Sequence, residues 1–217
     1  MFRDALKLLE IRARTRAPNW VRHAYRSVRA VAPQSQSRWL PDDLVQDCRF
    51  LASRYAILDA LPRQAKVVEL GTLRGDFAAE ILARTDPREL HLVDIDFSVL
   101  SEAVERDARV RCHRGMTHEV LGRFEDGSID WIYVDADHTY AGALRDAEAA
   151  AAKVRPGGYL VFNDFAHVDP EMGRYGVHRA VVDFAIAARW PLRFFAYQPS
   201  ALYDVALQKP VQGSSIL

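Results

Sequence analysis

Acidic residues come at the end of four short apolar runs in the sequence. The runs end in Glu69, Asp94, Asp135 and the pair Asn163-Asp164. Apolar runs bounded by turn residues predict buried strands, and the carboxyl ends of parallel strands lie along one edge of a sheet, where ligands bind. Four acidic groups on one edge would repel each other unless a positive group is bound among them. The sequence therefore predicts a ligand site at this edge.

The first apolar run leads into a glycine loop. Residues 67–76 read VVELGTLRGD, so Gly71 and Gly75 frame a turn between a strand and a helix. Gly71 permits a sharp turn or a positive φ, and Gly75 permits a close approach of the helix N-terminus to the sheet or to a ligand. The spacing E-x-G-x-x-x-G differs from the dinucleotide-binding G-x-G-x-x-G, and Glu69 would repel a pyrophosphate. Glu69 instead suits a ligand that presents hydrogen-bond donors or positive charge.

Asp94 ends the second run, 23 positions after Gly71, where an acid can accept hydrogen bonds from both hydroxyls of a ribose. The segments ELGTLRG and HLVDID resemble the first motif and its successor in class I S-adenosylmethionine-dependent methyltransferases, over roughly residues 60–210. The resemblance implies that Asp94 holds the ribose. It also implies that the amino-acid end of S-adenosylmethionine is lined by Glu69, Gly71, Thr72 and Gly75.

The third and fourth runs supply further polar groups. Asp135 ends WIYVD, His138 follows three residues later, and Asn163-Asp164 follows GGYLVF. The carboxylates of Asp135 and Asp164 and the carbonyl oxygen of Asn163 are hard oxygen ligands, which suit Mg²⁺ or a similar ion. Such an ion would hold a substrate hydroxyl, lower its pKa and orient it toward a methyl donor.

The segments VDADHTY and GGYLVFND resemble metal-dependent small-molecule O-methyltransferases, of both the catechol and caffeoyl-CoA type and the macrocin and cephalosporin tailoring type. In the first type a lysine stands three residues after the strand-end aspartate, and in the second a histidine does. By position, the resemblance implies that Asp135, Asn163 and Asp164 are metal ligands and that His138 is the general base. The order Asn163-Asp164 departs from both types and leaves fewer charges for an ion. A cap on the following helix is the alternative role for His138.

Strands and helices alternate from Lys66 onward. The predicted strands are 66–70, 89–94, 110–114, 129–134 and 158–162, and the predicted helices are 76–85, 98–107, 117–123, 140–153 and 177–189. This alternation predicts a doubly wound α/β fold with parallel strands and right-handed crossovers. Arg155-Pro156-Gly157-Gly158 predicts a turn before the fifth strand. Runs at 192–197 and 201–208 predict a C-terminal antiparallel hairpin, as in the Rossmann-like methyltransferase sheet that the resemblance implies.

The N-terminal residues differ in charge from the rest of the chain. Residues 1–38 hold nine basic and two acidic residues, a formal charge of +7, and the whole chain has formal net charge zero. We expect amphipathic helices over 1–32, forming a basic arm ahead of a methyltransferase domain at 39–217. The arm is expected to cover the domain or to join a homo-oligomer, with a membrane surface or nucleic acid as the alternative contact.

The residues after the arm predict one more helix. Pro41, Asp42 and Asp43 are expected to cap a helix that carries Leu44, Cys48, Leu51 and Tyr55.

Composition bears on the compartment. Cys48 and Cys112 form no disulfide framework, which favours a reducing cytoplasm. No apolar run approaches the roughly 20 residues of a membrane span, and the N-terminus lacks the apolar segment of a secretory signal. We therefore expect a cytoplasmic protein.

The two resemblances imply methyl transfer from S-adenosylmethionine to a small-molecule hydroxyl, assisted by a divalent cation and by His138. A nucleic-acid methyltransferase is one alternative, but base amino methylation usually goes with Asn/Asp-Pro-Pro-aromatic, and this chain reads Asn163-Asp164-Phe165. A nicotinamide oxidoreductase would need the missing G-x-G. A non-catalytic cofactor-binding protein is the third alternative. The loop at 166–176 is predicted to close over a substrate as a lid.

Overall fold

The computed structural model describes residues 38–166, 168–169, 173–199 and 202–211. The expected helices over 1–32 lie outside the described residues, as does nearly all of the expected basic arm. Contacts divide the chain into two units, and the main unit is Ser37–His167 with Tyr175–Leu217. The other unit includes an antiparallel ribbon of β7 (Val168–Asp169) and β8 (Gly173–Arg174), which belongs to the loop predicted to act as a lid.

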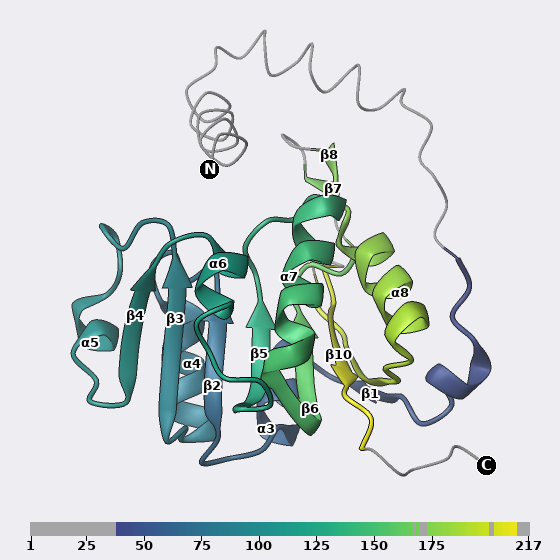
Figure 1. Ribbon diagram of the computed structural model, residues 1–217, viewed down its shortest axis with the longest axis horizontal. Helices are drawn as coiled ribbons and strands as arrows, with labels where there is room; N and C mark the ends of the chain where they lie inside the picture. Colours follow the sequence, from purple (N-terminus) through teal and green to yellow (C-terminus); the bar gives the residue numbers. More distant parts are fainter. Residues whose placement is uncertain (1–37, 167, 170–172, 200–201, 212–217) are drawn as a thin grey trace, which may run out of the picture. The chain divides into compact units, whose positions relative to one another are not determined.

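An eight-stranded sheet forms the centre of the main unit (Figure 1). Its strands are β1 (Arg49–Leu51), β2 (Lys66–Leu70), β3 (Glu89–Asp94), β4 (Val110–Arg114), β5 (Ile129–Val134), β6 (Val154–Phe162), β9 (Leu192–Ala196) and β10 (Asp204–Gln208). Their spatial order is β1-β9-β10-β6-β5-β2-β3-β4. Strand β10 runs antiparallel to β6 and β9, and the other neighbouring pairs are parallel. The predicted fold class, a mostly parallel sheet with a C-terminal antiparallel hairpin, is confirmed.

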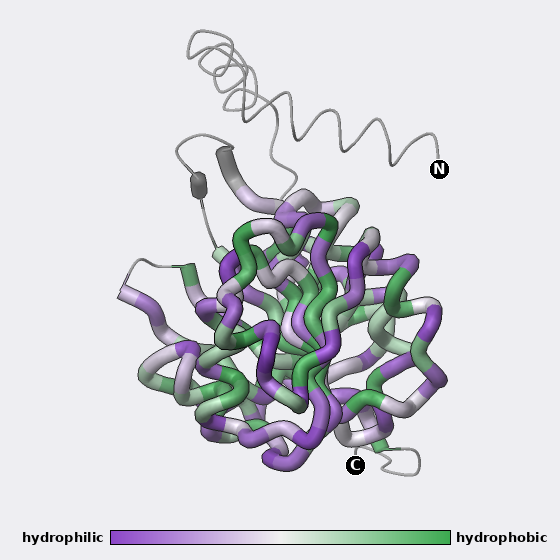
Figure 2. Tube along the Cα trace, turned by 90° about the vertical axis from the view of Figure 1, so that its left-hand side faces the viewer, coloured by the Kyte–Doolittle hydropathy of each residue, from purple (hydrophilic) through white to green (hydrophobic). Residues whose placement is uncertain are grey.

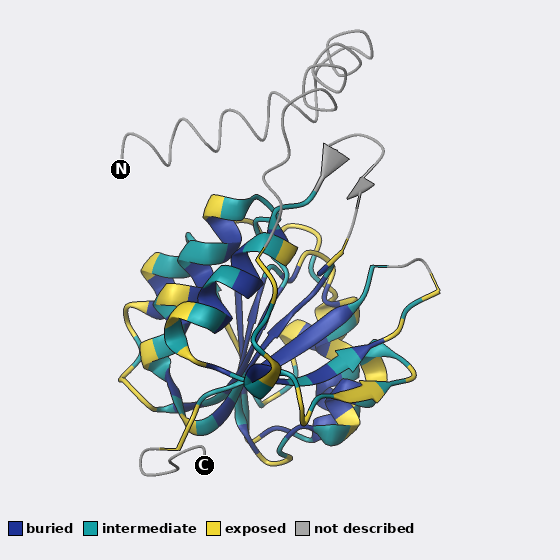
Figure 3. Cartoon of the chain, turned by 90° about the vertical axis from the view of Figure 1, so that its right-hand side faces the viewer, coloured by how far each residue is buried: buried dark blue, intermediate teal, exposed yellow. Residues whose placement is uncertain are grey.

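Helices cover both faces of this sheet. They are the 3₁₀ turn η1 (Asp42–Leu44) and the α-helices α3 (Arg54–Ala60), α4 (Asp76–Thr85), α5 (Glu102–Glu105), α6 (Thr117–Leu121), α7 (Tyr140–Lys153) and α8 (Val177–Ala188). Apolar side chains of α3, α4 and α5 pack on one face, and those of α6, α7 and α8 pack on the other. Figure 3 shows the buried sides of these helices turned toward buried strands.

The central strands are apolar on both faces because helices cover both faces. Val67 and Val68 of β2 point to opposite faces and are both fully buried, and Ile132 of β5 is buried as well. The chain trace coloured by hydropathy has the same pattern, with apolar strands inside and polar segments outside (Figure 2). Continuous apolar runs of this kind are the signal that made β2, β3 and β5 readable from the sequence.

Strand boundaries agree with the sequence except at β6 and in the C-terminal hairpin, where β9 ends at Ala196 and β10 begins at Asp204. The strands predicted at 66–70, 89–94, 110–114 and 129–134 are confirmed, but β6 begins at Val154 and not at residue 158. The expected turn at 155–158 lies inside the strand, where the pairing with β5 shifts register between Ile129 and Trp131. Gly157 has φ of 77° and its N–H donates to the Lys209 carbonyl. The glycines therefore build a bulge in a continuing strand and do not end it.

The helix predicted around residues 44–55 is wrong. The chain forms the short turn η1, then β1, and then α3, whose N-cap Ser53 accepts a hydrogen bond from the Ala56 N–H at 3.3 Å. Strand β1 pairs with β9 at the edge of the sheet, where the rings of Phe50 and Phe195 stack at 5.9 Å. This pairing with a strand almost 150 residues away, at Leu192–Ala196, overrides the local helical spacing. Helices α5 and α6 are also shorter than predicted.

Gly71 generates a prediction about stability. It has φ of 85°, and an added Cβ would overlap the carbonyl oxygen of Asp135. We expect Gly71→Ala to lower the free energy of unfolding by the sum of about 1–2 kcal/mol of backbone strain and about 1–3 kcal/mol of overpacking. Gly127→Ala is the matched control, since Gly127 has φ of 67° but open space around its Cβ position. Urea unfolding of both variants measures the difference, and equal losses would contradict the steric argument.

Candidate functional site

The carboxyl edge of the sheet holds the residues that the sequence singled out. Glu69 and Asp94 are at the ends of β2 and β3, Asp135 directly follows β5, and Asn163-Asp164 directly follows β6. The amide Nδ2 of Asn163 donates a hydrogen bond to Asp135 Oδ1 at 2.8 Å. The structure thus brings the four predicted acidic ends together on one edge.

Asp94 ties the glycine loop to β3. Its Oδ2 accepts hydrogen bonds from the backbone N–H groups of Thr72 at 2.9 Å and Leu73 at 3.0 Å, and its Oδ1 accepts from the Asp96 N–H at 3.1 Å. These bonds use three of the about four lone-pair positions of a carboxylate. Asp94 therefore shapes the loop, and the ribose-binding role that the sequence predicts for it stays a prediction.

Gly75 lets the loop turn into α4. It is the N-cap residue of α4 and has φ of 80°, a left-handed conformation that favours glycine. A Cβ at this position would come within 2.8 Å of the Leu100 side chain. The first turn of α4 therefore lies against the segment that follows β3.

Glu69 is a buried carboxyl beneath the loop. It is 1% exposed and accepts a hydrogen bond from Thr72 Oγ1 at 3.0 Å. Burial raises its pKa to about 8; the Thr72 hydrogen bond and the charge of Arg54 oppose this shift, and the charges of Asp135 and Asp94 add to it. The neutral form therefore predominates at pH 7, and a bound cation would favour ionisation.

His138 lies between two carboxylates. Its Nε2 is 3.2 Å from Asp135 Oδ1 and 3.6 Å from Asp164 Oδ2, and its ring stacks on Tyr175 at 4.4 Å between centroids. Burial by itself lowers the pKa of His138, but the adjacent carboxylates of Asp135 and Asp164 outweigh it and raise the pKa. The alternative role as a helix cap is wrong, because Thr139 caps α7 by accepting from the Gly142 N–H.

The oxygen donors for a cation are gathered, but His138 stands among them. Among the described residues, Asn163 Oδ1 is buried without a hydrogen-bond partner, which suits an oxygen ligand. With Asp135 and Asp164 it makes a set of hard donors. However, the imidazole Nε2 is near both carboxylates, and no group of three or more His, Cys, Asp or Glu side chains in the described ranges is arranged to hold a metal ion. A cation would fit this donor set only with the imidazole displaced.

The sequence analysis missed a second polar group at this edge. Asp204 begins β10 and is fully buried; its Oδ2 accepts from the Tyr133 hydroxyl at 2.6 Å and its Oδ1 from Gln198 Nε2 at 2.5 Å. Burial raises the pKa of Asp204 to about 6, against the opposing effects of Arg54 and Tyr133. The available signal was an acid at the start of the apolar run DVALQ. An antiparallel strand begins at the edge where parallel strands end.

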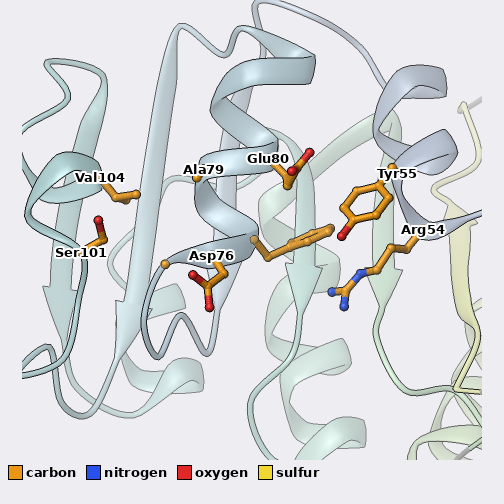
Figure 4. A pocket seen from close by; sticks show the side chains of 9 residues that line it. Arg54, Tyr55, Asp76, Ala79, Glu80, Ser101 and Val104 are labelled. Carbon is orange, nitrogen blue, oxygen red and sulfur yellow. The ribbon is translucent and has the colours of Figure 1, made fainter. Parts of the chain in front are cut away.

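A cavity of about 390 Å³ lies beside the first turn of α4 (Figure 4). It is lined by Arg54, Tyr55, Gly75, Asp76, Phe77, Ala79, Glu80, Ser101 and Val104. Arg54 extends from α3 toward the start of α4.

None of the helices in the described part of the chain is long and apolar enough to span a membrane.

Residues 68–165 match the family described as "Methyltransferase domain". The matched segment is less than half of the chain and includes the glycine loop, Asp94, Asp135 and His138.

Solved structures share the fold at low sequence identity. An S-adenosylmethionine-dependent methyltransferase from Mesorhizobium loti has a TM-score of 0.52 and 15% identity, and the match covers 73% of this chain and 98% of that one. The N-methyltransferase NodS from Bradyrhizobium japonicum has a TM-score of 0.54 and 15% identity, and the match covers 73% of this chain and 95% of that one. An O-methyltransferase family protein from Burkholderia thailandensis has a TM-score of 0.54 and 15% identity, and the match covers 73% of this chain and 55% of that one. No curated protein matches the sequence.

Glu69 generates a prediction about pH and stability. Because its pKa is raised from 4.5 to about 8, the folded protein holds this proton more tightly than the unfolded chain. Its contribution to stability is present below about pH 4.5 and is lost as pH rises toward 8, with a slope of at most about 1.4 kcal/mol per pH unit. We expect the cofactor-free wild type to lose stability relative to Glu69→Gln over this range in urea unfolding. The exposed Glu119→Gln serves as control, and parallel curves for wild type and Glu69→Gln would count against the assignment.

Asp94 generates a prediction about cofactor binding. Asp94→Ala removes an acceptor for the ribose and releases the loop N–H groups, and hydrogen bonds to charged groups contribute about 1.5–3 kcal/mol each. We expect the affinity for S-adenosylmethionine to fall roughly tenfold or more in calorimetry. The exposed neighbour Asp96→Ala is the control. Unchanged affinity in Asp94→Ala would remove this role, and binding of NADH in place of S-adenosylmethionine would revive the oxidoreductase alternative.

Proposed function

We propose that this protein transfers a methyl group from S-adenosylmethionine to the hydroxyl of a small molecule, with His138 as general base. One observation carries the proposal: the His138 imidazole lies at the carboxyl edge with Nε2 between Asp135 and Asp164, and Asp135 abuts the glycine loop through Gly71. A base in this position would be beside a methyl donor bound at the glycine loop. The resemblance of VDADHTY to the tailoring O-methyltransferases supports the same role.

Each residue of the site would have a separate role in the methyl transfer. Asp94 holds the ribose, and Glu69, Thr72 and the two glycines of the loop line the amino-acid end. The substrate oxygen attacks the sulfonium methyl carbon, the carbon–sulfur bond breaks, and the sulfur leaves with that electron pair as a neutral thioether. The hydroxyl proton passes to His138. Asp135 and Asp164 stabilise the imidazolium that forms, because opposite charges close by favour the protonated form.

A divalent cation is the second part of this proposal. Asp135, Asn163 Oδ1 and Asp164 would hold it, and the unpartnered amide oxygen supports such a role. When bound, the cation would act as a Lewis acid that lowers the pKa of the substrate hydroxyl. Its binding requires the imidazole to move away from the two carboxylates.

The base role of His138 is tested by turnover. Positioned bases contribute about 10²–10⁴-fold, so His138→Ala should lower the methylation rate by that order with little change in cofactor affinity. Because the pKa of His138 is raised, the neutral base forms as pH rises above about 6.5, and the wild-type rate should increase through that region. A screen of phenols, catechols and sugar hydroxyls with labelled S-adenosylmethionine supplies the substrate, and His118→Ala on α6 is the control. Near wild-type turnover of His138→Ala across pH 6–9 would sink the proposal.

The cation is tested separately. We expect EDTA to suppress wild-type methylation, Mg²⁺ to restore it, and Asp135→Ala to remove the dependence on Mg²⁺. If EDTA leaves the rate unchanged, the cation is not part of the reaction, Asp135 and Asp164 are polar anchors for the substrate, and His138 acts alone.

A further inference from the structure

The guanidinium of Arg54 lies near the glycine loop and has an unpaired N–H donor among the described residues. Its side chain is 22% exposed, and its Nη2 donates a hydrogen bond to the hydroxyl of Tyr133. The Nε atom is buried and has no hydrogen-bond partner in the described part of the chain. A guanidinium has five N–H donors, and leaving buried donors unpaired is costly. The guanidinium is therefore able to donate to an acceptor beyond those that the described residues supply.

The nearest carboxylate does not meet this need. Asp204 Oδ2 is 3.6 Å from Arg54 Nε, beyond hydrogen-bond distance, while both oxygens of Asp204 already accept shorter bonds from Tyr133 and Gln198. Asp204 thus offsets part of the charge of Arg54 without occupying its N–H groups.

Aromatic rings fix the guanidinium in place. Its central carbon lies 4.1 Å from the centroid of the Phe77 ring, and the Phe77 ring lies 4.2 Å from the Tyr133 ring. Stacking of this kind holds the plane of an arginine and leaves its N–H edge available. The rings therefore help to hold the orientation of Arg54 alongside the hydrogen bond from Nη2 to Tyr133, and the Nε donor stays unused among the described residues.

The guanidinium lies next to the predicted amino-acid end of the cofactor. Tyr133, to which it is bonded, is the register partner of Glu69 on the neighbouring strand. Phe77 is in the first turn of α4, two residues after Gly75, and both line the same cavity as Arg54 (Figure 4). A cation and a carboxyl therefore lie side by side beneath the loop. An α-amino acid, whose ammonium and carboxylate are attached to one carbon, needs such a pair.

We propose that Arg54 binds the carboxylate of the methionine part of S-adenosylmethionine, while Glu69 binds its ammonium. The planar fork of a guanidinium matches a carboxylate with two parallel hydrogen bonds. The inference rests on the proposed cofactor. It adds a specificity-determining residue from α3, outside the segment matched by the family, and it makes the site selective for the intact amino acid.

Decarboxylated S-adenosylmethionine is the probe that isolates this contact, because it lacks the carboxylate and keeps the ammonium, the sulfonium and the nucleoside. In calorimetry of the full chain, we expect Arg54→Gln to weaken binding of S-adenosylmethionine tenfold or more and to leave binding of the decarboxylated compound within about twofold. Arg54→Lys, which keeps the charge and loses the fork, should weaken S-adenosylmethionine by a smaller factor. Arg84→Gln, an arginine of α4 paired with Glu80, is the control and should change neither affinity.

Each outcome decides a separate point. Unchanged affinity of the decarboxylated compound also demonstrates that Arg54→Gln is folded with its nucleoside site intact. Equal losses for both ligands, or no loss for either, would overturn the role of Arg54 and leave the proposed function standing. If the wild type binds neither ligand, the cofactor assignment itself fails, and the role of Arg54 fails with it.

Discussion

The candidate site depends on how closely two backbone segments approach at the centre of the sheet. Gly71 lies against the Asp135 carbonyl with no room for a side chain, and hydrogen bonds from the Gly71 N–H to Val93 and from the Asp135 N–H to Leu70 join the ends of three adjacent strands. This is the point where the chain, having left β2 toward β3 and β4, returns to the other side at β5. Ligands of open parallel sheets bind at the carboxyl edge beside such a reversal. The positions of Glu69, Asp94 and Asp135 all follow from it.

Charge balance at this edge is met in three different ways. The Asp94 carboxylate accepts hydrogen bonds from backbone N–H groups. Glu69 stays protonated at pH 7 and so carries no charge. Asp135 and Asp164 have the His138 imidazole between them. The repulsion expected from four acidic strand ends is thus relieved inside the protein before any ligand is considered. A methyl donor with a sulfonium and an ammonium adds positive charge to an edge that still has acidic groups available.

The parts of the fold that the sequence predicts well are those whose pattern lies within one continuous segment of the chain. Strands β2, β3 and β5 are continuous apolar runs that end in an acid, so both their limits and the polar groups at their ends could be read directly. The proximity of Arg54 and Asp204 could not be predicted from the sequence, because it depends on the antiparallel placement of β10 and on the contact of α3 with Tyr133. Strand β1 was misread for a related reason: Phe50 finds its partner, Phe195, far along the chain. Local spacing contains no information about either pairing.

The interior position of β10 has a consequence for how the protein is made. Residues 204–208 come late in the chain, yet they separate β6 from β9 and so connect β9 and β1 to the rest of the sheet. During synthesis, which proceeds from the N-terminus, the early strands can assemble first, while β1 waits for β9 and β9 waits for β10. Contacts between such distant segments are slow to form. Since Asp204 is the first residue of β10, the buried polar group around Tyr133 is completed only in this last step, so a partly synthesised chain would already have its glycine loop but not a finished binding edge.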